Sequence, residues 1–298
     1  MFMDIRRKAL PEFGSSDYIF DLPWLLPLQI STLYAGDRGP SGAEGVSRHK
    51  EIAKLAGFLE RPVISCHQVH SLKVLVYPKA KAPFLCVGTW VNDKLFYSYV
   101  PIKQDEEPEA KGASENGMVR VAGKLDADGI LTDMPVLLGV TVADCLPVAF
   151  RTGNWSALLH SGWQGTGILG VALFGLETIF SQEQKNTSVT ALAVVFGPSV
   201  RADHYPVPEE RAALFARRFG VNVTPRLPDG QPALDIRKAN LDILADWELS
   251  KPGRTVMVEV CEDSTVEHLG LHSYRRDGGS PRYGRMLVLF NTASSQVD

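Results

Sequence analysis

Two apolar runs separated by a short turn constrain the fold of this chain more than any other feature. Residues 136–150 and 155–160 are rich in apolar and β-branched side chains, and the sequence Arg-Thr-Gly-Asn lies between them. Short apolar runs on either side of a Gly/Asn turn are typical of a β-hairpin. The sequence therefore predicts a β-sheet core that contains this hairpin.

The predicted hairpin brings two reactive side chains together. If its loop centres on Thr152-Gly153, Arg151 pairs with Asn154, and the same register places Cys145 directly opposite His160. Directly opposed residues have Cβ atoms about 4.5–5.5 Å apart on one face of the sheet. That spacing suits two ligands of one Zn²⁺, or a thiolate beside its base.

A further ligand is expected from His67-Gln-Val-His70, which lies in a strand predicted over residues 63–76. Residues three apart on a strand point to opposite faces, so only one of these two histidines can join Cys145 and His160. A Cys-His-His set leaves the fourth tetrahedral position of zinc open, as in catalytic sites. The alternative is that the histidines are ordinary polar residues and Cys145 is a small buried core residue.

Two other motifs could bind an anion. Residues 162–167, Gly-Trp-Gln-Gly-Thr-Gly, separate a predicted strand from a predicted helix, where free backbone N–H groups favour phosphate. A tight turn without a ligand is the alternative. Residues 274–277, Tyr-Arg-Arg-Asp, are followed by Arg282 and Arg285, whose guanidinium groups suit phosphate or surface salt bridges.

Elsewhere, hairpins alternate with separate helices, which favours one α+β domain over residues 1–298. Helices are predicted at 47–58, after the glycine-rich turn to about 180, at 208–219 and, capped by Asp235, to about 249. Further strands are predicted at 84–91, 94–100, 191–196, 255–260 and 286–290. Residues 103–117 are polar and acidic, and they are expected to form a solvated loop that folding does not need.

Charge and cysteine content exclude several partners. The net charge is −3, which offers no electrostatic reason to bind nucleic acid or an anionic membrane. The first apolar stretch is short and is interrupted by Pro23 and Pro27, so neither a signal peptide nor a transmembrane segment is expected. Four cysteines make no disulfide framework, which favours a reducing, cytoplasmic location.

Taken together, several motifs resemble the YfiH family, whose members are variously described as laccase-domain, polyphenol oxidase or purine nucleoside phosphorylase proteins. The matching segments are Gln68-Val-His70, Asp126-Ala-Asp128 with Thr132, residues 141–147 (TVADCLP), residues 160–165 (HSGWQG), Gly197-Pro-Ser-Val200, and residues 273–277 with Gly284-Arg285. The chain differs where the family commonly has basic residues, at Leu33 and Gln164, and residues 77–122 resemble an insertion that contains a hairpin and the acidic loop.

The resemblance implies an α/β/β/α layered fold, and it selects His70 over His67 as the zinc ligand beside Cys145 and His160. It also implies that the substrates are purine nucleosides and phosphate. The residues expected to contact them are Arg48, Gln68, Gly165, Arg275 and Arg276. Asp144 is a candidate for proton transfer, with a simple turn residue as the alternative.

The leading hypothesis is therefore a zinc enzyme that phosphorolyses adenosine, inosine or methylthioadenosine-type nucleosides and deaminates adenosine. The alternative is a Cys-His hydrolase or amidase, including an enzyme of peptidoglycan precursor editing, with Cys145 as nucleophile and His160 as base. A copper polyphenol oxidase is disfavoured, because the seven histidines include no H-x-H pair. A non-catalytic partner subunit that retains the site is a further alternative.

Overall fold

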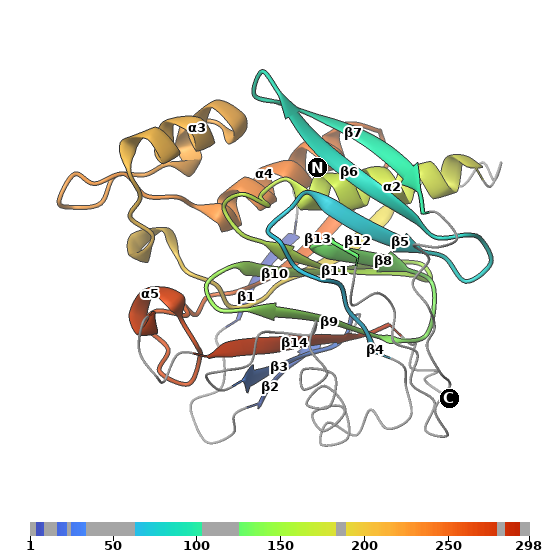
Figure 1. Ribbon diagram of the computed structural model, residues 1–298, viewed down its shortest axis with the longest axis horizontal. Helices are drawn as coiled ribbons and strands as arrows, with labels where there is room; N and C mark the ends of the chain where they lie inside the picture. Colours follow the sequence, from blue (N-terminus) through green and yellow to red (C-terminus); the bar gives the residue numbers. More distant parts are fainter. Residues whose placement is uncertain are drawn as a thin grey trace.

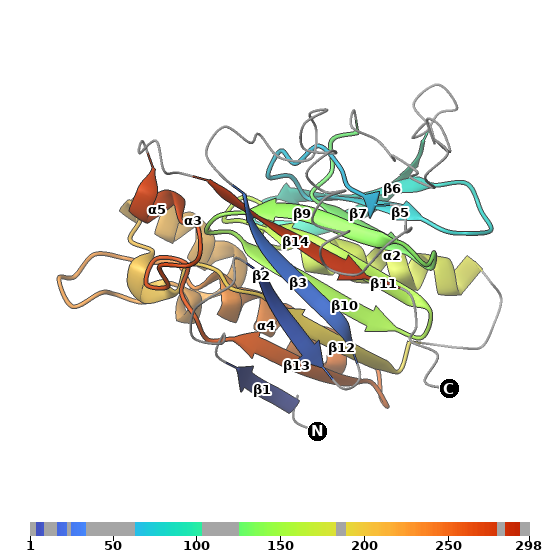
Figure 2. The same cartoon turned by 90° about the horizontal axis from the view of Figure 1, so that it is seen from below.

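Two β-sheets packed face to face form the centre of the computed structural model, which describes residues 4–8, 17–22, 25–33, 63–102, 125–182, 189–278 and 284–292. The larger sheet contains, in spatial order, β1 (Asp4–Lys8), β13 (Thr255–Cys261), β12 (Ala191–Phe196), β10 (Leu146–Thr152), β11 (Trp155–Ser161), β8 (Gly129–Thr132), β5 (Lys73–Tyr77), β6 (Phe84–Val91) and β7 (Lys94–Pro101). The smaller sheet contains β2 (Asp17–Leu22), β3 (Leu25–Leu33), β14 (Arg285–Asn291), β9 (Leu137–Val142) and β4 (Val63–Ile64). Figure 2 shows the smaller sheet lying across the larger one.

Helices cover the face of the larger sheet that points away from the smaller sheet (Figure 1). The helical elements are α2 (Ile168–Gln182), α3 (Glu209–Phe219), α4 (Ile236–Leu249), the short α5 (Tyr274–Asp277) and two 3₁₀ turns, Ala202–His204 and Val221–Val223. Asp235 caps α4 by accepting a hydrogen bond from the Lys238 amide at 2.8 Å. The predictions of an α+β fold with packed sheets and flanking helices, and of these three long helices, are confirmed.

The core has two layers, one on each face of the larger sheet. In β10, Val148 and Phe150 pack toward the helices, whereas Ala149 packs toward the smaller sheet. A strand that is buried on both faces has no polar alternation, which explains why the sequence shows continuous apolar runs here.

Turn chemistry accounts for the best-predicted hairpin. Strands β6 and β7 have nearly the predicted bounds, and the two loop residues between them, Asn92 and Asp93, have φ values of 49° and 58°. Two positive φ angles in a two-residue loop are what a type I′ turn requires, and Asn and Asp tolerate them. The predicted strands at 191–196, 255–260 and 286–290 are also confirmed, each within one residue at either end.

Two predicted strands are wrong because each is in fact a pair of strands in different sheets. Residues 136–150 form β9 in the smaller sheet and β10 in the larger sheet, and Ala143-Asp144-Cys145 crosses between them. Residues 63–76 likewise divide into β4 and β5, and the His67–His70 sequence lies in the irregular crossing between the two. Both crossings run from the smaller to the larger sheet.

The predicted register of the central hairpin is also wrong, by two residues. Thr152 pairs with Trp155, so the loop is Gly153-Asn154, and Pro147 rather than Cys145 lies opposite His160. Gly153 has φ 53°, which fits a type II′ turn, in which glycine occupies the first loop position. Cys145 lies one residue before this ladder, which begins with Leu146 opposite Ser161, so the shift of two residues still leaves it beside the end of β11.

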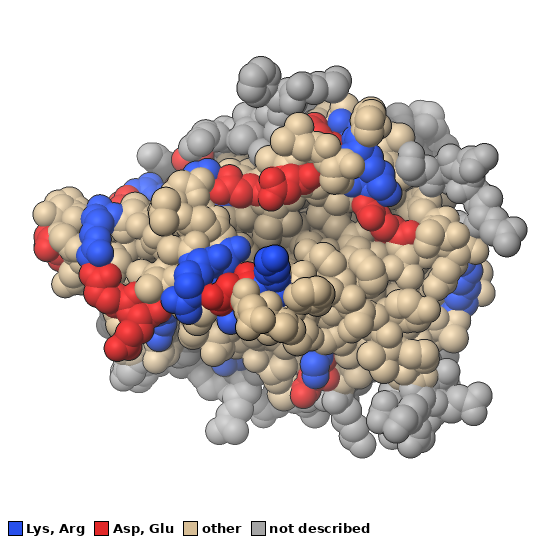
Figure 3. All heavy atoms as spheres, turned by 90° about the horizontal axis from the view of Figure 1, so that it is seen from above, with Lys and Arg blue, Asp and Glu red and all other residues tan. Residues whose placement is uncertain are grey.

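Some predictions fall on residues outside the described ranges, namely the 47–58 helix, the acidic 103–117 loop and Arg48. The proposed insertion at 77–122 and the boundaries of the single domain stay predictions. Within the described ranges, no helix is long and apolar enough to cross a membrane. On the face of the molecule drawn in Figure 3, basic and acidic side chains are interspersed.

Candidate metal centre

The two sheet crossings and the end of β11 bring three metal-ligand side chains together. His70 lies on the first crossing, Cys145 on the second, and His160 is the penultimate residue of β11. One ligand atom from each residue lies within 4.8 Å of the other two, and the two imidazole ring centroids are 4.7 Å apart. Cys145 and His160 are thus close together as predicted, although the strand register differs from the predicted one. His70 is the third member of the cluster.

The cluster is closed on one side and open on the other. His160 is 3% exposed, Cys145 is half-buried, and His70 is exposed to solvent. Three protein ligands that face solvent on one side leave room for a water or a substrate atom. This is the arrangement of catalytic zinc sites, whereas structural sites enclose the metal fully.

Asp128, immediately before β8, organises the cluster. Its carboxylate accepts a hydrogen bond from His160 Nδ1 at 2.9 Å and is 1% exposed. The backbone amide of His160 donates to the Asp128 carbonyl at 2.7 Å, so Asp128 holds both the main chain and the side chain of His160. Since Nδ1 is used by Asp128, Nε2 is the nitrogen that remains for a metal or a proton. Carboxylate–histidine–metal arrangements of this kind fix the orientation of the ring.

The same carboxylate also positions His70. It accepts hydrogen bonds from the amides of Val69 (3.2 Å), His70 (3.0 Å) and Ser71 (2.5 Å), and from the Ser71 hydroxyl at 2.7 Å. His70 has φ 58°, a left-handed conformation that costs a non-glycine residue on the order of 1–3 kcal/mol. Asp128 therefore stabilises a strained turn that presents the His70 side chain to the cluster.

The electrostatics of the cluster favour a thiolate. Burial by itself raises the pKa of Cys145, but the charges of His160 and His70 and their hydrogen bonds outweigh burial and lower it to about 6. Burial by itself lowers the pKa of His160, but the charge of Cys145 and the hydrogen bond to Asp128 raise it to about 10. The two shifts therefore favour the thiolate form of Cys145 and the protonated form of His160. The thiolate is the form that both binds metals and acts as a nucleophile.

The glycine-rich turn makes room for the cluster. A Cβ atom at Gly162 would lie 2.8 Å from Cys145 Sγ and 3.2 Å from His70 Cδ2, so a side chain there would collide with two members. A Cβ at Gly165 would lie 3.2 Å from the Ser71 carbonyl oxygen, which shows how closely the turn packs on the first crossing. The predicted role of Gly165 in phosphate contact stays a prediction.

His67 lies apart from the cluster. Its Nδ1 is 2.9 Å from the Asp126 carboxylate, and both side chains are about half exposed. The structure therefore groups His70, and not His67, with Cys145 and His160, although the argument from strand alternation does not apply to this irregular segment.

Two predicted site residues hold the crossings in place. Gln68 donates to the Thr141 carbonyl at 2.8 Å, and its side-chain oxygen accepts from the Thr141 amide at 2.7 Å, which ties the first crossing to β9. The Asp144 carboxylate accepts from the Thr265 hydroxyl at 2.7 Å and from the Arg275 amide at 2.8 Å. Substrate contact by Gln68 and proton transfer by Asp144 stay predictions.

The two predicted arginines of α5 differ in their surroundings. The Arg276 guanidinium donates to the backbone carbonyls of Thr265, Val266, His268 and Leu271 and pairs with Asp277, so it orders the preceding loop. Arg275 is exposed, and its guanidinium stacks on the Tyr205 ring at 4.1 Å. Only Arg275 presents its charge outward.

Sequence reasoning overlooked the function of Asp128 and the presence of Tyr205. Asp128 precedes a fully buried strand, and an acidic residue at such a position is a signal of a paired carboxylate. Tyr205 follows a 3₁₀ turn far along the chain, and no local pattern connects it with Cys145.

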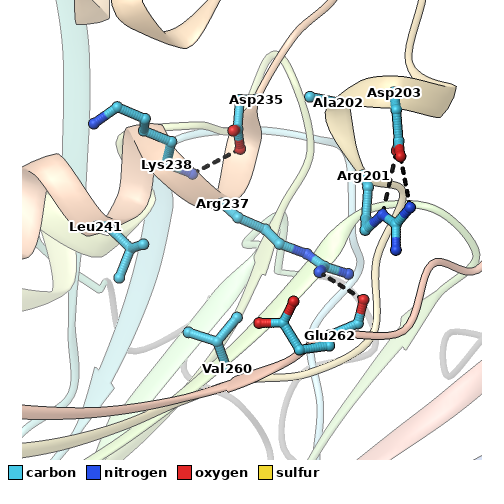
Figure 4. A pocket seen from close by; sticks show the side chains of 9 residues that line it. All are labelled: Arg201, Ala202, Asp203, Asp235, Arg237, Lys238, Leu241, Val260 and Glu262. Atoms are coloured by element: carbon cyan, nitrogen blue, oxygen red, sulfur yellow. Dashed lines mark hydrogen bonds and ion pairs between the residues drawn. The ribbon is translucent and has the colours of Figure 1, made fainter. Parts of the chain in front are cut away.

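A second cluster of possible ligands consists of Asp203, His204 and Glu267, whose ligand atoms also lie within 4.8 Å of one another. It borders an open pocket of about 520 Å³ that contains the basic side chains Arg201, Arg237 and Lys238 (Figure 4). Arg201 pairs with Asp203, and the Arg237 guanidinium donates to Ser199 and to the Asp263 carbonyl. Lys238 pairs with Asp242. Each basic side chain of this pocket therefore already has a hydrogen-bond or ion-pair partner.

Comparison with known proteins identifies a family match over most of the chain. The family model described as "Multi-copper polyphenol oxidoreductase laccase" matches residues 36–292. A protein of Aquifex aeolicus named purine nucleoside phosphorylase is 28% identical over 194 residues, which cover 64% of this chain and 82% of that protein. A protein of the same name from Borreliella burgdorferi is 28% identical over 131 residues, 42% of this chain and 56% of that protein.

Solved structures share the fold at low identity. YfiH of Bacillus licheniformis, described as hypothetical, aligns with a TM-score of 0.62 at 17% identity, over 95% of this chain and 98% of that one. YlmD of Geobacillus stearothermophilus aligns with a TM-score of 0.61 at 21% identity over the same shares. A Neisseria meningitidis protein of family DUF152 has a TM-score of 0.58 at 22% identity, over 92% and 98% of the two chains.

Proposed function

The chain belongs to the family described as multi-copper polyphenol oxidoreductase laccase, as its resemblance to YfiH predicts, and we propose that it is a zinc enzyme of purine nucleosides. The names of its two curated relatives support this substrate class. The observation that carries the proposal is the group of His70, Cys145 and His160, with its ligand atoms within 4.8 Å of one another and one side open.

The residues fit zinc better than other metals. One thiolate and two imidazoles are a ligand set that zinc commonly takes, and three protein ligands leave the position that a catalytic zinc needs. Asp128 supplies the carboxylate that orients a metal-bound histidine. A bound zinc would act as a Lewis acid toward a substrate oxygen or a water molecule.

The proposed reactions are phosphorolysis of adenosine, inosine or methylthioadenosine-type nucleosides and deamination of adenosine. In this proposal His70, Cys145 and His160 bind the metal, Asp128 holds the His160 ring and the backbone turn at His70, and the exposed side of His70 admits the substrate. Asp144 anchors the second crossing through Thr265 and the Arg275 amide, and it stays a candidate for proton transfer.

A Cys-His hydrolase is the second candidate, and one observation favours it. Cys145, His160 and Asp128 form a continuous thiolate–imidazolium–carboxylate chain when no metal is bound. This is the order of nucleophile, base and orienting group in cysteine hydrolases. Metal content separates the two candidates, because a thiolate bound to zinc is a poor nucleophile and a free one reacts with iodoacetamide.

Copper oxidase chemistry is disfavoured despite the family's description. Multicopper sites need many histidine ligands, and the seven histidines of this chain include no H-x-H pair. Within the described residues, the cluster offers only two histidines and one cysteine, with no second histidine cluster beside it.

The test combines metal analysis with product analysis. Purified protein is expected to contain zinc and to convert adenosine, with products that depend on phosphate: adenine and a sugar phosphate for phosphorolysis, inosine and ammonia for deamination. His70→Ala is expected to lose zinc and turnover, whereas the matched variant His67→Ala keeps both, since the His67 side chain bonds to Asp126 and lies outside the cluster.

Three results would count against the proposal. Full turnover by metal-free protein would move the Cys-His hydrolase to first place. Stoichiometric copper in the purified protein, together with oxidation of phenols, would favour the copper polyphenol oxidase hypothesis instead. Zinc without turnover of any nucleoside would favour a non-catalytic partner subunit that retains the site.

A further inference from the structure

One edge of the larger sheet is formed by β7, the second strand of the hairpin whose loop is Asn92-Asp93. Among the strands that the structure describes, only β6 pairs with β7, and Figure 1 shows β7 on the outer side of β6. An edge strand presents a row of unpaired backbone N–H and C=O groups, to which another strand can bind. The outer side of β7 is therefore a potential interaction surface.

The side chains of β7 are apolar for a strand in this position. The exposed fractions of Phe96, Tyr97, Tyr99 and Val100 lie between 41% and 55%, and Lys94 is the only charged residue of the strand. The register with β6 is continuous from one end to the other, so no β-bulge twists this edge away. Charges, bulges and prolines are the usual protection of an edge strand, and the one proline of β7 is its last residue.

The opposite edge of the same sheet has a different character. It is formed by β1, whose sequence DIRRK contains four charged residues among five. Such a density of charge on an edge strand opposes pairing with another chain. Of the two edges of the larger sheet, β7 is thus the one whose sequence favours association.

The hairpin geometry determines which backbone groups of β7 point outward. In a two-residue hairpin, the residues that flank the loop, here Val91 and Lys94, form a hydrogen-bonded pair, and such pairs alternate with non-hydrogen-bonded pairs along the ladder. The even-numbered residues of β7 therefore direct their backbone groups at β6, as Lys94 does. The odd-numbered residues Leu95, Tyr97 and Tyr99 direct theirs toward the open edge.

These three outward-directed residues are self-complementary. If two β7 strands pair antiparallel with Tyr97 opposite its own copy, Leu95 lies opposite Tyr99, and each of the three residues exchanges hydrogen bonds with another of the three. A shift of the register in one direction places Leu95 opposite Pro101, which has no N–H group. A shift in the other direction places Tyr99 opposite Asp93 in the loop. Only the centred register uses the whole edge.

The centred register also keeps like charges apart. It places Lys94 opposite Val100 of the second copy, and Phe96 opposite Ser98. Like charges that lie directly opposite each other destabilise a pair of strands, and this register has none. The edge therefore fits a second copy of itself in backbone bonding and in charge.

The area of the edge fits a weak, reversible dimer. An aromatic side chain buries about 150–250 Å² when it is fully covered, so the three half-exposed rings of β7 offer roughly 300 Å² in each copy. Two copies, with the strand backbones added, reach the size of weak complexes, which bury less than about 1,200 Å² in total. A permanent dimer needs more.

We propose that β7 is a self-association edge, through which two copies of the chain pair antiparallel about a two-fold axis at Tyr97. The two larger sheets then form one continuous sheet, and the interface is closed because the same surface is used in both copies. No residue of the metal cluster takes part, so this inference is independent of the proposed function.

The first experiment measures the mass of the full chain by sedimentation velocity between about 1 and 200 µM, the range in which a weak dimer dissociates. The wild type is expected to pass reversibly from monomer to dimer. Phe96→Lys replaces an exposed ring beside the axis with a charge, and it is expected to weaken dimerisation about tenfold or more. Thr89→Lys is the matched control, because Thr89 lies on the same face of β6, opposite Phe96, and is expected to dimerise as the wild type does. Equal melting temperatures verify that both variants fold.

The second experiment tests the register by disulfide formation. Phe96→Cys and Ser98→Cys chains, when mixed, place the new cysteines in a non-hydrogen-bonded pair with Cα atoms about 4.5 Å apart, within the range of a disulfide. Either variant alone brings its cysteines together only diagonally, at about 7–8 Å. The mixture is expected to cross-link at least about tenfold faster than either variant alone. The wild type, treated in the same way, controls for the native cysteines.

Four results would overturn the proposal. The wild type could remain monomeric over the whole concentration range, or it could form open-ended polymers instead of dimers. Phe96→Lys could dimerise as strongly as Thr89→Lys, which would place the contact on another surface. Equal cross-linking in the mixture and in the single variants would show that the strands do not pair in the centred register.

Discussion

Two clusters in this protein contain three possible metal ligands each, and their surroundings differ sharply. His70, Cys145 and His160 lie where two sheet crossings meet, and Asp128, whose carboxylate bonds to the His70 amide and the His160 ring, is 1% exposed. Asp203, His204 and Glu267 lie on the surface, where the side chains of Asp203 and Glu267 are 54% and 49% exposed.

The two clusters differ more in their cationic neighbours than in their exposure. Arg201 pairs with Asp203 at 2.5 Å and with Glu267 at 3.3 Å, so an incoming metal ion would have to compete with a guanidinium that already contacts both carboxylates. No arginine or lysine pairs with the described side chains of the first cluster, and Asp128 orders two of its members instead. Proximity of ligand atoms is therefore not sufficient for a metal centre, which also needs fixed ligands and no competing cation.

The largest effect is expected from Cys145→Ser. Serine keeps the approximate size of cysteine but is a far poorer zinc ligand than a thiolate. Bound zinc, measured by mass spectrometry of the purified protein, and adenosine turnover are both expected to vanish. Cys86→Ala, a change at a buried thiol outside the cluster, serves as the control and is expected to retain both. Stoichiometric zinc in Cys145→Ser would refute the ligand set.

Asp128→Asn is expected to have the next largest effect. Loss of the carboxylate weakens the hold on His160 and on the left-handed turn at His70, and partners of this kind typically contribute about 10–100-fold to metal affinity. Competition with a chelator measures the change. Asp126→Asn removes the neighbouring carboxylate, which contacts only the exposed His67, and it should leave zinc affinity unchanged. Equal losses in both variants would show that Asp128 has no special role.

A smaller effect is expected from Gly162→Ala. The added methyl group would lie 2.8 Å from Cys145 Sγ, and relieving such overpacking costs about 1–3 kcal/mol. We expect part of this cost to appear as weaker zinc binding in the chelator assay. The matched variant Gly175→Ala places a methyl group 3.0 Å from Cys86 Sγ, away from the cluster, and should lower thermal stability without changing zinc affinity. Unchanged zinc affinity in Gly162→Ala would mean that the turn does not shape the site.

The smallest effect is expected at the second cluster. A protein with both His204→Ala and Glu267→Gln should keep the zinc content and the turnover of the wild type, because Arg201 already occupies the carboxylates. A drop in zinc content by one ion per chain would reverse the comparison and identify the surface cluster as a genuine site.

Local sequence patterns were sufficient for most of the fold. Residues 92–93 specify the β6–β7 hairpin, because Asn and Asp tolerate the positive φ angles of its loop. The acidic first turn and basic last turn of α3, and the Asp235 cap of α4, mark helix ends through interactions within a few residues. The sequence also predicted that Cys145 and His160 meet, although the register was wrong by two residues and Cys145 lies one residue before the paired strand.

Only the tertiary structure decided how these elements combine into a site. The apolar run at 136–150 does not reveal that it leaves one sheet and enters another at Asp144, because strands buried in either sheet have the same composition. His70 is placed by Asp128, 58 positions away, and the Arg275 amide of α5 donates to Asp144, the residue before Cys145. Periodicity and turn residues report the local environment of a segment. Which segments become neighbours depends on long-range packing, and for this reason the sequence determined the elements and the tertiary structure decided the site.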